Sequence, residues 1–228
     1  MNIHFEIPNT WCWFCWTFGV ALATTLMMSF QSRNFLTRYR SIRKFSILDL
    51  EFPSSAQDLV KIIGGMYRLP KIESEKSIRS LRNSLYIDFA FMPAIYGSVF
   101  LLCMHVSEKF SWIGVSVFAV FAWFQGLSWI FDIIENIYLL QKIKPDAVQS
   151  SALVHELYRY MVIAKWAIAL FGGVCSLMAL LYFWTTGIFD SHNLKYFLYI
   201  LAEVVSFLIV GNLLNKKKVI SETSSVAN

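Results

Sequence analysis

WIGVSVFAVFAWFQGLSWIFDIIENIYLL, residues 112–140, is a long apolar run that decides the fold class of the chain. A helix needs about 20 mainly apolar residues to cross the hydrocarbon core of a bilayer. This run exceeds that length, and its only charged residues are Asp132 and Glu135. It does not alternate as barrel strands do, and lipid cannot satisfy the edge of an open sheet. The run therefore predicts a membrane-spanning helix.

The composition of the whole chain agrees with a membrane protein. Of its 228 residues, 57% are hydrophobic and only 15% are charged, and the mean hydropathy is +0.53. Soluble chains carry roughly 25% charged residues. The net charge of +5 would suggest nucleic acid in a soluble protein. In a membrane protein the positions of the basic residues report orientation instead, so we predict no nucleic-acid partner.

Four further stretches meet the same length criterion. We therefore predict one all-α membrane domain over residues 1–228, a bundle of about five transmembrane helices. The predicted spans are Trp11–Phe30, Leu85–Val106, Trp112–Leu140, Met161–Trp184 and Tyr196–Leu214.

Basic residues are concentrated on alternate connections between these spans. They are frequent in residues 31–83, after the third span and in the tail after the fifth span, and sparse in the other two connections. Cytoplasmic segments of membrane proteins carry this excess of lysine and arginine. The pattern predicts an N-terminus outside and a C-terminus inside, and we expect the membrane to be the bacterial inner membrane.

Residues 31–83 form the longest segment between predicted spans, and we expect a cytoplasmic loop. Within it, residues 55–67 have the apolar spacing of a short amphipathic helix, with Ser55 placed to cap its first turn. Such a helix beside basic residues suits the inner surface of the membrane. The same apolar face could instead pack against the inner ends of the spans, and the sequence leaves both arrangements open.

Glu203 is the ionisable residue closest to the middle of a predicted span. A charged side chain at that depth costs about 3 kcal/mol on insertion scales, and such residues commonly mark functional sites. Gln125 and Ser176 are expected at a matching depth and are the predicted partners. Glu203 is then either part of a proton, cation or ligand site, or a neutral side chain bonded to a neighbouring helix.

A second group of polar residues is predicted near the inner ends of the second, third and fourth spans. The spacing of Asp132, Glu135 and Asn136 puts all three on one helix face. We expect them to meet other polar side chains at the same depth, and the predicted group is Arg82, Asp88, Asp132, Glu135, Asn136 and Lys165. It forms either a cation, proton or headgroup site, or a salt-bridge network that joins the helices.

Motifs of known chemistry are scarce. Cys12 and Cys15 form a C-x-x-C, which is a weak signal for a metal or redox site because cysteine is common in apolar segments. The sequence contains no phosphate-binding loop and no H-E-x-x-H or G-x-S-x-G pattern. We therefore predict neither a metal nor a cofactor and assign no catalytic residue.

Three segments together resemble a set of small bacterial multi-pass membrane proteins that has no assigned activity. The segments are FSILDLEF at 45–52 with the predicted helix Ala56–Ile63 after it, LYIDF around Asp88, and DIIEN at 132–136. The resemblance covers roughly residues 45–140 and implies a shared bundle in which Asp88, Asp132, Glu135 and Asn136 matter. In that set a small Gly-Thr turn follows the first motif, whereas this chain has residues 52–55, Phe-Pro-Ser-Ser.

Three classes of function follow from these residues. The first is a lipid- or partner-binding accessory protein, whose partners are membrane lipids and a possible second protein or second copy of the chain. The second is a component of proton- or cation-coupled transport or of a channel, using Glu203 or the acidic group. The third is an enzyme acting on a lipid or isoprenoid, with carboxylates as acid and base.

Overall fold

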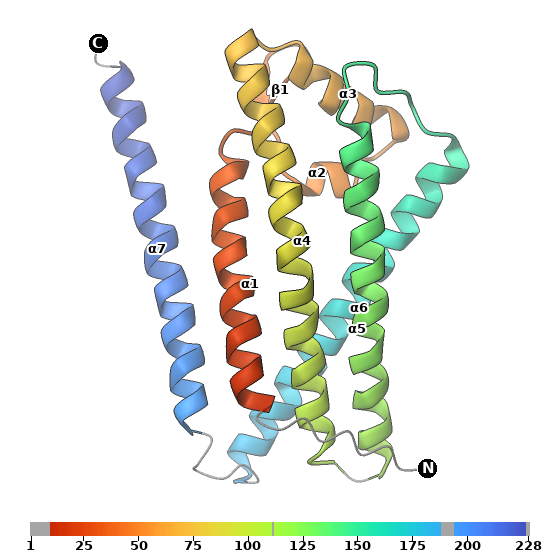
Figure 1. The fold of residues 1–228 in the computed structure, drawn as a ribbon, viewed down its shortest axis with the longest axis vertical. Helices are drawn as coiled ribbons and strands as arrows, with labels where there is room; N and C mark the ends of the chain where they lie inside the picture. The colour runs from red at the N-terminus through yellow and green to blue at the C-terminus, as the bar shows by residue number, and fades with distance from the viewer. Residues whose placement is uncertain (1–9, 111, 188–193, 227–228) are drawn as a thin grey trace.

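The computed structural model describes residues 10–110, 112–187 and 194–226, and in them five long helices carry a smaller assembly at one end (Figure 1). Each long helix contains an apolar stretch that is long enough to cross a bilayer. The all-α, multi-pass membrane fold is thus confirmed. The five helices are α1 (Thr10–Ser32), α4 (Lys71–Ser107), α5 (Trp112–Lys142), α6 (Ala152–Thr185) and α7 (Leu194–Val226).

The long helices alternate in direction and differ in how closely they pack. Helices α1, α4 and α5 stand side by side, α6 crosses obliquely behind α5, and α7 lies at the outer edge beside α1 (Figure 1). The extensive contacts join α1 to α4, α4 to α5 and α5 to α6, whereas α7 packs mainly on α1. The α5–α6 connection and the C-terminal end of α7 lie at the same end as the smaller assembly.

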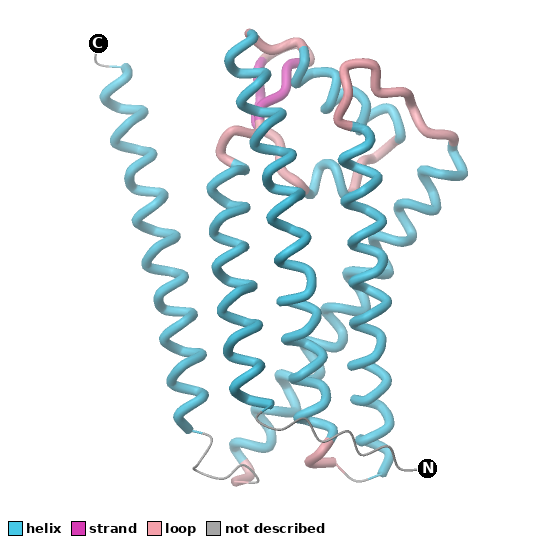
Figure 2. Tube along the Cα trace, viewed as in Figure 1, coloured by secondary structure: helices cyan, strands magenta, loops and turns pink. Residues whose placement is uncertain are grey.

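That assembly, residues 33–70, is called the cap below. It contains a short antiparallel hairpin, β1 (Leu36–Arg38) and β2 (Ile42–Lys44), followed by the helices α2 (Leu48–Glu51) and α3 (Ala56–Tyr67) (Figure 2). The hairpin was not predicted from the sequence. Helix α3 begins where the sequence places it, because the Ser55 hydroxyl accepts a hydrogen bond from the Asp58 N–H at 3.3 Å.

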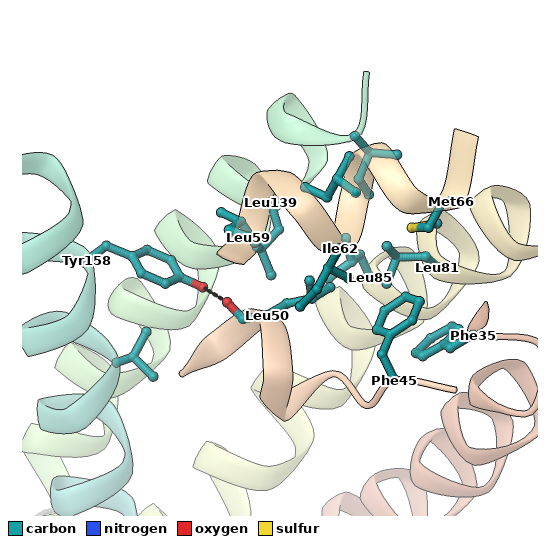
Figure 3. Packing of buried hydrophobic residues seen from close by; sticks show 13 residues of the cluster. Phe35, Phe45, Leu50, Leu59, Ile62, Met66, Leu81, Leu85, Leu139 and Tyr158 are labelled. Atoms are coloured by element: carbon teal, nitrogen blue, oxygen red, sulfur yellow. Dashed lines mark hydrogen bonds between the residues drawn. The ribbon is translucent and has the colours of Figure 1, made fainter. Parts of the chain in front are cut away.

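The apolar face of α3 packs into the bundle and does not face solvent. In Figure 3, Leu59, Ile62 and Met66 of α3 lie among side chains from three of the long helices. The Tyr158 hydroxyl of α6 donates to the Leu50 carbonyl oxygen at 3.1 Å and ties α2 to the same cluster. Of the two arrangements that the sequence left open, the structure has the one in which this helix packs against the ends of the spans. The remaining buried members are Phe35, Phe45, Leu50, Ile63, Leu81, Leu85, Leu139, Ile143 and Val162.

Two long helices begin earlier than the predicted spans. Helix α4 begins at Lys71 and not near Leu85, and α6 begins at Ala152 and not near Met161. The first turns of α4 pack against the cap through small polar residues, which a search for apolar residues overlooks. Ser77 is an example of how a small polar residue serves at this contact. Its hydroxyl accepts a hydrogen bond from the Leu36 N–H at 3.1 Å and donates one to the Leu36 carbonyl oxygen at 3.0 Å. The buried serines at helical spacing are Ser74, Ser77, Ser80 and Ser84.

Candidate functional site

Lys165 of α6 is the centre of a buried group of charged side chains. Its ammonium lies 2.8 Å from Asp132 Oδ1 and 2.6 Å from Glu135 Oε2, both on α5. Glu51 of the cap contributes a third carboxylate, with Oε2 at 3.9 Å. All four side chains are buried, and Glu135 is only 1% exposed. The cap and two spans therefore meet at one ammonium group.

Polar side chains of neighbouring helices complete this group. The Tyr96 hydroxyl of α4 donates to Asp132 Oδ2 at 2.9 Å. The Asn136 amide of α5 donates to Asp88 Oδ2 at 2.8 Å and to the Leu85 carbonyl oxygen at 3.3 Å. Because Tyr96 and Asp88 both belong to α4, these bonds extend the network to a third span.

The structure brings together five of the six residues of the predicted inner group. Asp132, Glu135 and Asn136 share one face of α5, as their spacing requires. Asp88 and Lys165 reach the same group from α4 and α6. Arg82 differs from the expectation, since its guanidinium donates to the Ile143 carbonyl oxygen at 3.0 Å, just beyond the end of α5.

Glu51 is the member of the group that sequence reasoning missed. It belongs to the four-residue helix α2 in what was expected to be a loop, so depth in the membrane gave no reason to select it. Its Oε2 accepts a hydrogen bond from the Trp166 indole N–H at 2.9 Å. Burial raises the pKa of the Glu51 carboxyl above its ordinary value, while Lys165 and that indole N–H oppose the shift. No local pattern distinguishes Glu51, because Asp49 in the same segment also lies between apolar neighbours and is exposed.

The charge balance of the group explains what it can do. Three carboxyl groups, those of Glu51, Asp132 and Glu135, lie within 4 Å of one ammonium group, and the carboxyl of Asp88 joins them through Asn136. In the part of the chain that the structure describes, no cluster of three His, Cys, Asp or Glu side chains has the geometry of a metal site. The arrangement supports the salt-bridge network, in which Lys165 is the internal counter-ion.

Glu203 lies elsewhere, in a groove between α1 and α7. The groove has a volume of about 630 Å³ and mostly apolar walls. Gly19 of α1 faces the carboxyl group so closely that an added Cβ would lie 3.0 Å from Glu203 Oε1. Oε2 is buried and, among the described residues, has no hydrogen-bond partner. The Glu203 carboxyl group thus lines an apolar groove, and one of its oxygens has no hydrogen-bond partner among the described residues.

The predicted partners of Glu203 are engaged with other helices. The Gln125 amide donates to the carbonyl oxygens of Phe121 and Ile168, at 3.1 and 3.4 Å. The Ser176 hydroxyl lies 3.0 Å from Cys103 Sγ. Position along a span does not determine which helix a side chain faces, and α7 packs mainly on α1. The C-x-x-C thiols are both free, with Cys12 exposed and Cys15 beside the groove.

Fold and site together define a multi-pass helical membrane protein with a buried charge network and a lateral groove. No protein-family model matches the chain, and comparisons with curated proteins and with solved structures found no significant match. The resemblance to small bacterial multi-pass proteins therefore stays a prediction.

Proposed function

We propose that the protein binds an amphiphilic membrane molecule in the groove between α1 and α7. The observation that carries this proposal is the unused Glu203 carboxyl oxygen inside an apolar groove. A buried polar atom without a partner is costly, so a ligand that supplies a hydrogen bond there gains affinity. The groove volume of about 630 Å³ lies in the range of small-molecule sites.

The lining of the groove indicates the class of ligand. Side chains such as Trp16, Leu26 and Phe207 offer apolar contact, and Glu203 offers an acceptor. The matching ligand has a long apolar chain and one hydrogen-bond donor. Glu203 lies near the middle of the apolar part of α7, whereas the headgroup of an ordinary lipid stays at the interface. A long-chain alcohol therefore fits better than a phospholipid.

The test compares geranylgeraniol with geranylgeranyl methyl ether, which has the same chain but no donor. We expect the wild-type protein, by native mass spectrometry from detergent micelles, to bind the alcohol about tenfold more tightly, which corresponds to about one hydrogen bond. Glu203→Leu should bind both compounds equally. Ser206→Ala, in the same groove, serves as the matched control and should keep the preference.

Two results would reject this proposal. One is equal binding of the alcohol and the ether by the wild-type protein, and the other is a preference that survives in Glu203→Leu. If the groove is instead filled by a second copy of the chain, the same spectra will contain a dimer. Its mass will equal that of two chains, with no bound ligand. That outcome would replace lipid binding with partner binding.

Proton- or cation-coupled transport is the second candidate, favoured by the excess of carboxyl groups over the ammonium of Lys165. Proteoliposomes containing the protein should then show a pH-driven cation or proton flux that Asp132→Asn reduces. An identical flux in protein-free vesicles would exclude this candidate.

We propose a bacterial inner-membrane location with the N-terminus outside and the C-terminus inside. The concentration of basic residues at the cap end supports this orientation. A thiol reagent that cannot cross membranes should label the exposed Cys12 in intact cells. A cysteine introduced by Ser54→Cys in the cap, with Cys12 replaced by serine, should react only after permeabilisation. Labelling of Ser54→Cys in intact cells would reverse the orientation.

A further inference from the structure

The cap contains a polar pocket that is separate from both the charge network and the groove. It has a volume of about 530 Å³ and lies between the β1–β2 hairpin, the turn after α2 and one face of α3. Its lining includes four basic side chains, Arg40, Arg43, Lys44 and Lys61. Two acidic side chains, Asp49 and Asp58, also line it, so basic groups are in excess.

The acidic side chains of the pocket are already satisfied within the cap. Asp58 lies 3.0 Å from the Lys61 ammonium and accepts from the Ser55 hydroxyl at 2.9 Å, and these bonds lower the pKa of its carboxyl. Asp49 Oδ2 accepts from the Ser46 N–H at 2.8 Å. Asp58 is paired with Lys61, and Asp49 can offset only one of the three remaining basic groups, so the pocket keeps a net positive charge.

The side chains of Arg40 and Arg43, unlike those of Asp49 and Asp58, have no partner in the cap, all of whose residues the structure describes. Both are exposed, and in the described part of the chain no hydrogen bond or ion pair involves either guanidinium. An arginine presents a planar set of donors that matches the oxygens of a phosphate group. Two such groups line one concave pocket, and neither has an anionic partner among the described residues. The pocket therefore suits an anion from outside the chain.

The apolar residues around the pocket indicate where the anion comes from. Tyr39, Ile42 and Phe52 are 58%, 49% and 43% exposed, next to the basic residues. Exposed aromatic and aliphatic side chains interleaved with arginine and lysine are typical of surfaces that lie in the headgroup region of a membrane. A soluble anion would make no use of these side chains.

We propose that this pocket binds the phosphate group of an anionic lipid headgroup, with Arg40 and Arg43 as its principal ligands. Tyr39, Ile42 and Phe52 contact the adjacent acyl region. The site does not depend on the groove beside Glu203, so either proposal can fail without the other.

The experiment uses the full-length protein in detergent micelles and compares dioleoyl phosphatidic acid with dioleoyl phosphatidylserine and phosphatidylcholine by native mass spectrometry. The first has an exposed phosphate monoester, the second has similar charge without one, and the third is zwitterionic. We expect phosphatidic acid to bind most tightly. Arg40→Gln combined with Arg43→Gln should weaken that binding about tenfold or more, since each bond is charge-assisted.

The matched control is Lys76→Gln combined with Arg79→Gln, which removes the same charge from exposed positions on α4 outside the pocket. It should leave the affinity unchanged. Equal losses in both double variants, or none in the first, would overturn the proposal. Unchanged melting temperatures will show that both variants fold.

Inorganic phosphate and glycerol 3-phosphate test whether the phosphate comes from a soluble molecule. If they bind and phosphatidic acid does not, the proposed lipid source is wrong.

Discussion

Replacing Lys165 with methionine is expected to lower the free energy of unfolding by about 3–5 kcal/mol, the loss typical of removing one partner from a buried ion pair. Methionine keeps most of the length of the side chain but leaves Asp132 and Glu135 buried without their cation. Glu51 would lose its ionic contact with α6 at the same time, so the cap should loosen. Equilibrium unfolding in mixed micelles of dodecyl maltoside and sodium dodecyl sulfate measures the change.

Two comparison variants separate the loss of this network from a general effect of removing charge. Lys71→Met removes an exposed lysine at the start of α4 and should leave stability within about 0.5 kcal/mol of the wild type. Adding Asp132→Asn and Glu135→Gln to Lys165→Met should restore much of the loss, because the two carboxylates closest to the lost ammonium are then gone. If Lys165→Met behaved like Lys71→Met, the network would not hold the bundle together.

Gly65→Ala is expected to have the next largest effect, a loss of about 1–3 kcal/mol by overpacking. An added Cβ at Gly65 would overlap Thr37 Oγ1 and lie 2.9 Å from the Arg38 carbonyl oxygen. Helix α3 must therefore move away from β1. That movement would break the hydrogen bond from the Thr37 hydroxyl to the Ile62 carbonyl oxygen, which measures 2.8 Å. The same unfolding experiment, together with limited proteolysis of residues 33–70, reports the change.

The neighbouring glycine provides the matched control. An added Cβ at Gly64 meets no atom within 4 Å, so Gly64→Ala should be neutral or stabilise helix α3 by up to about 1 kcal/mol. Opposite signs for the two alanine variants would show that close approach, and not helix propensity alone, requires glycine at position 65. Equal effects would mean that the hairpin adapts to the larger side chain.

The membrane fold could be predicted from the sequence because it depends on the length of apolar runs, and run length is local. The start of α4 could not, because residues such as Ser77 are buried by hydrogen bonds to β1 and not by hydrophobicity. The hairpin could not be predicted either, because it also depends on hydrogen bonds between separate segments. Its exposed strand Ile42–Lys44 has no apolar pattern and depends on pairing with Leu36–Arg38.

The candidate site was partly predictable for a related reason. Helical spacing determines which side chains share a face, so Asp132, Glu135 and Asn136 could be grouped without a structure. Which helix faces which other helix is a tertiary property. Arg82 and Gln125 were therefore assigned neighbours that their side chains do not contact. Glu51 needed knowledge of how the cap folds back on α6.

The peripheral position of α7 has a mechanical consequence. Because α7 packs mainly on α1, whereas the bonds around Lys165 connect the cap with α4, α5 and α6, α7 can move without breaking any of those bonds. Such a displacement would widen or narrow the space beside Glu203 while the rest of the molecule keeps its shape. If the groove binds a ligand as proposed, a ligand entering past α7 would leave the bonds around Lys165 intact.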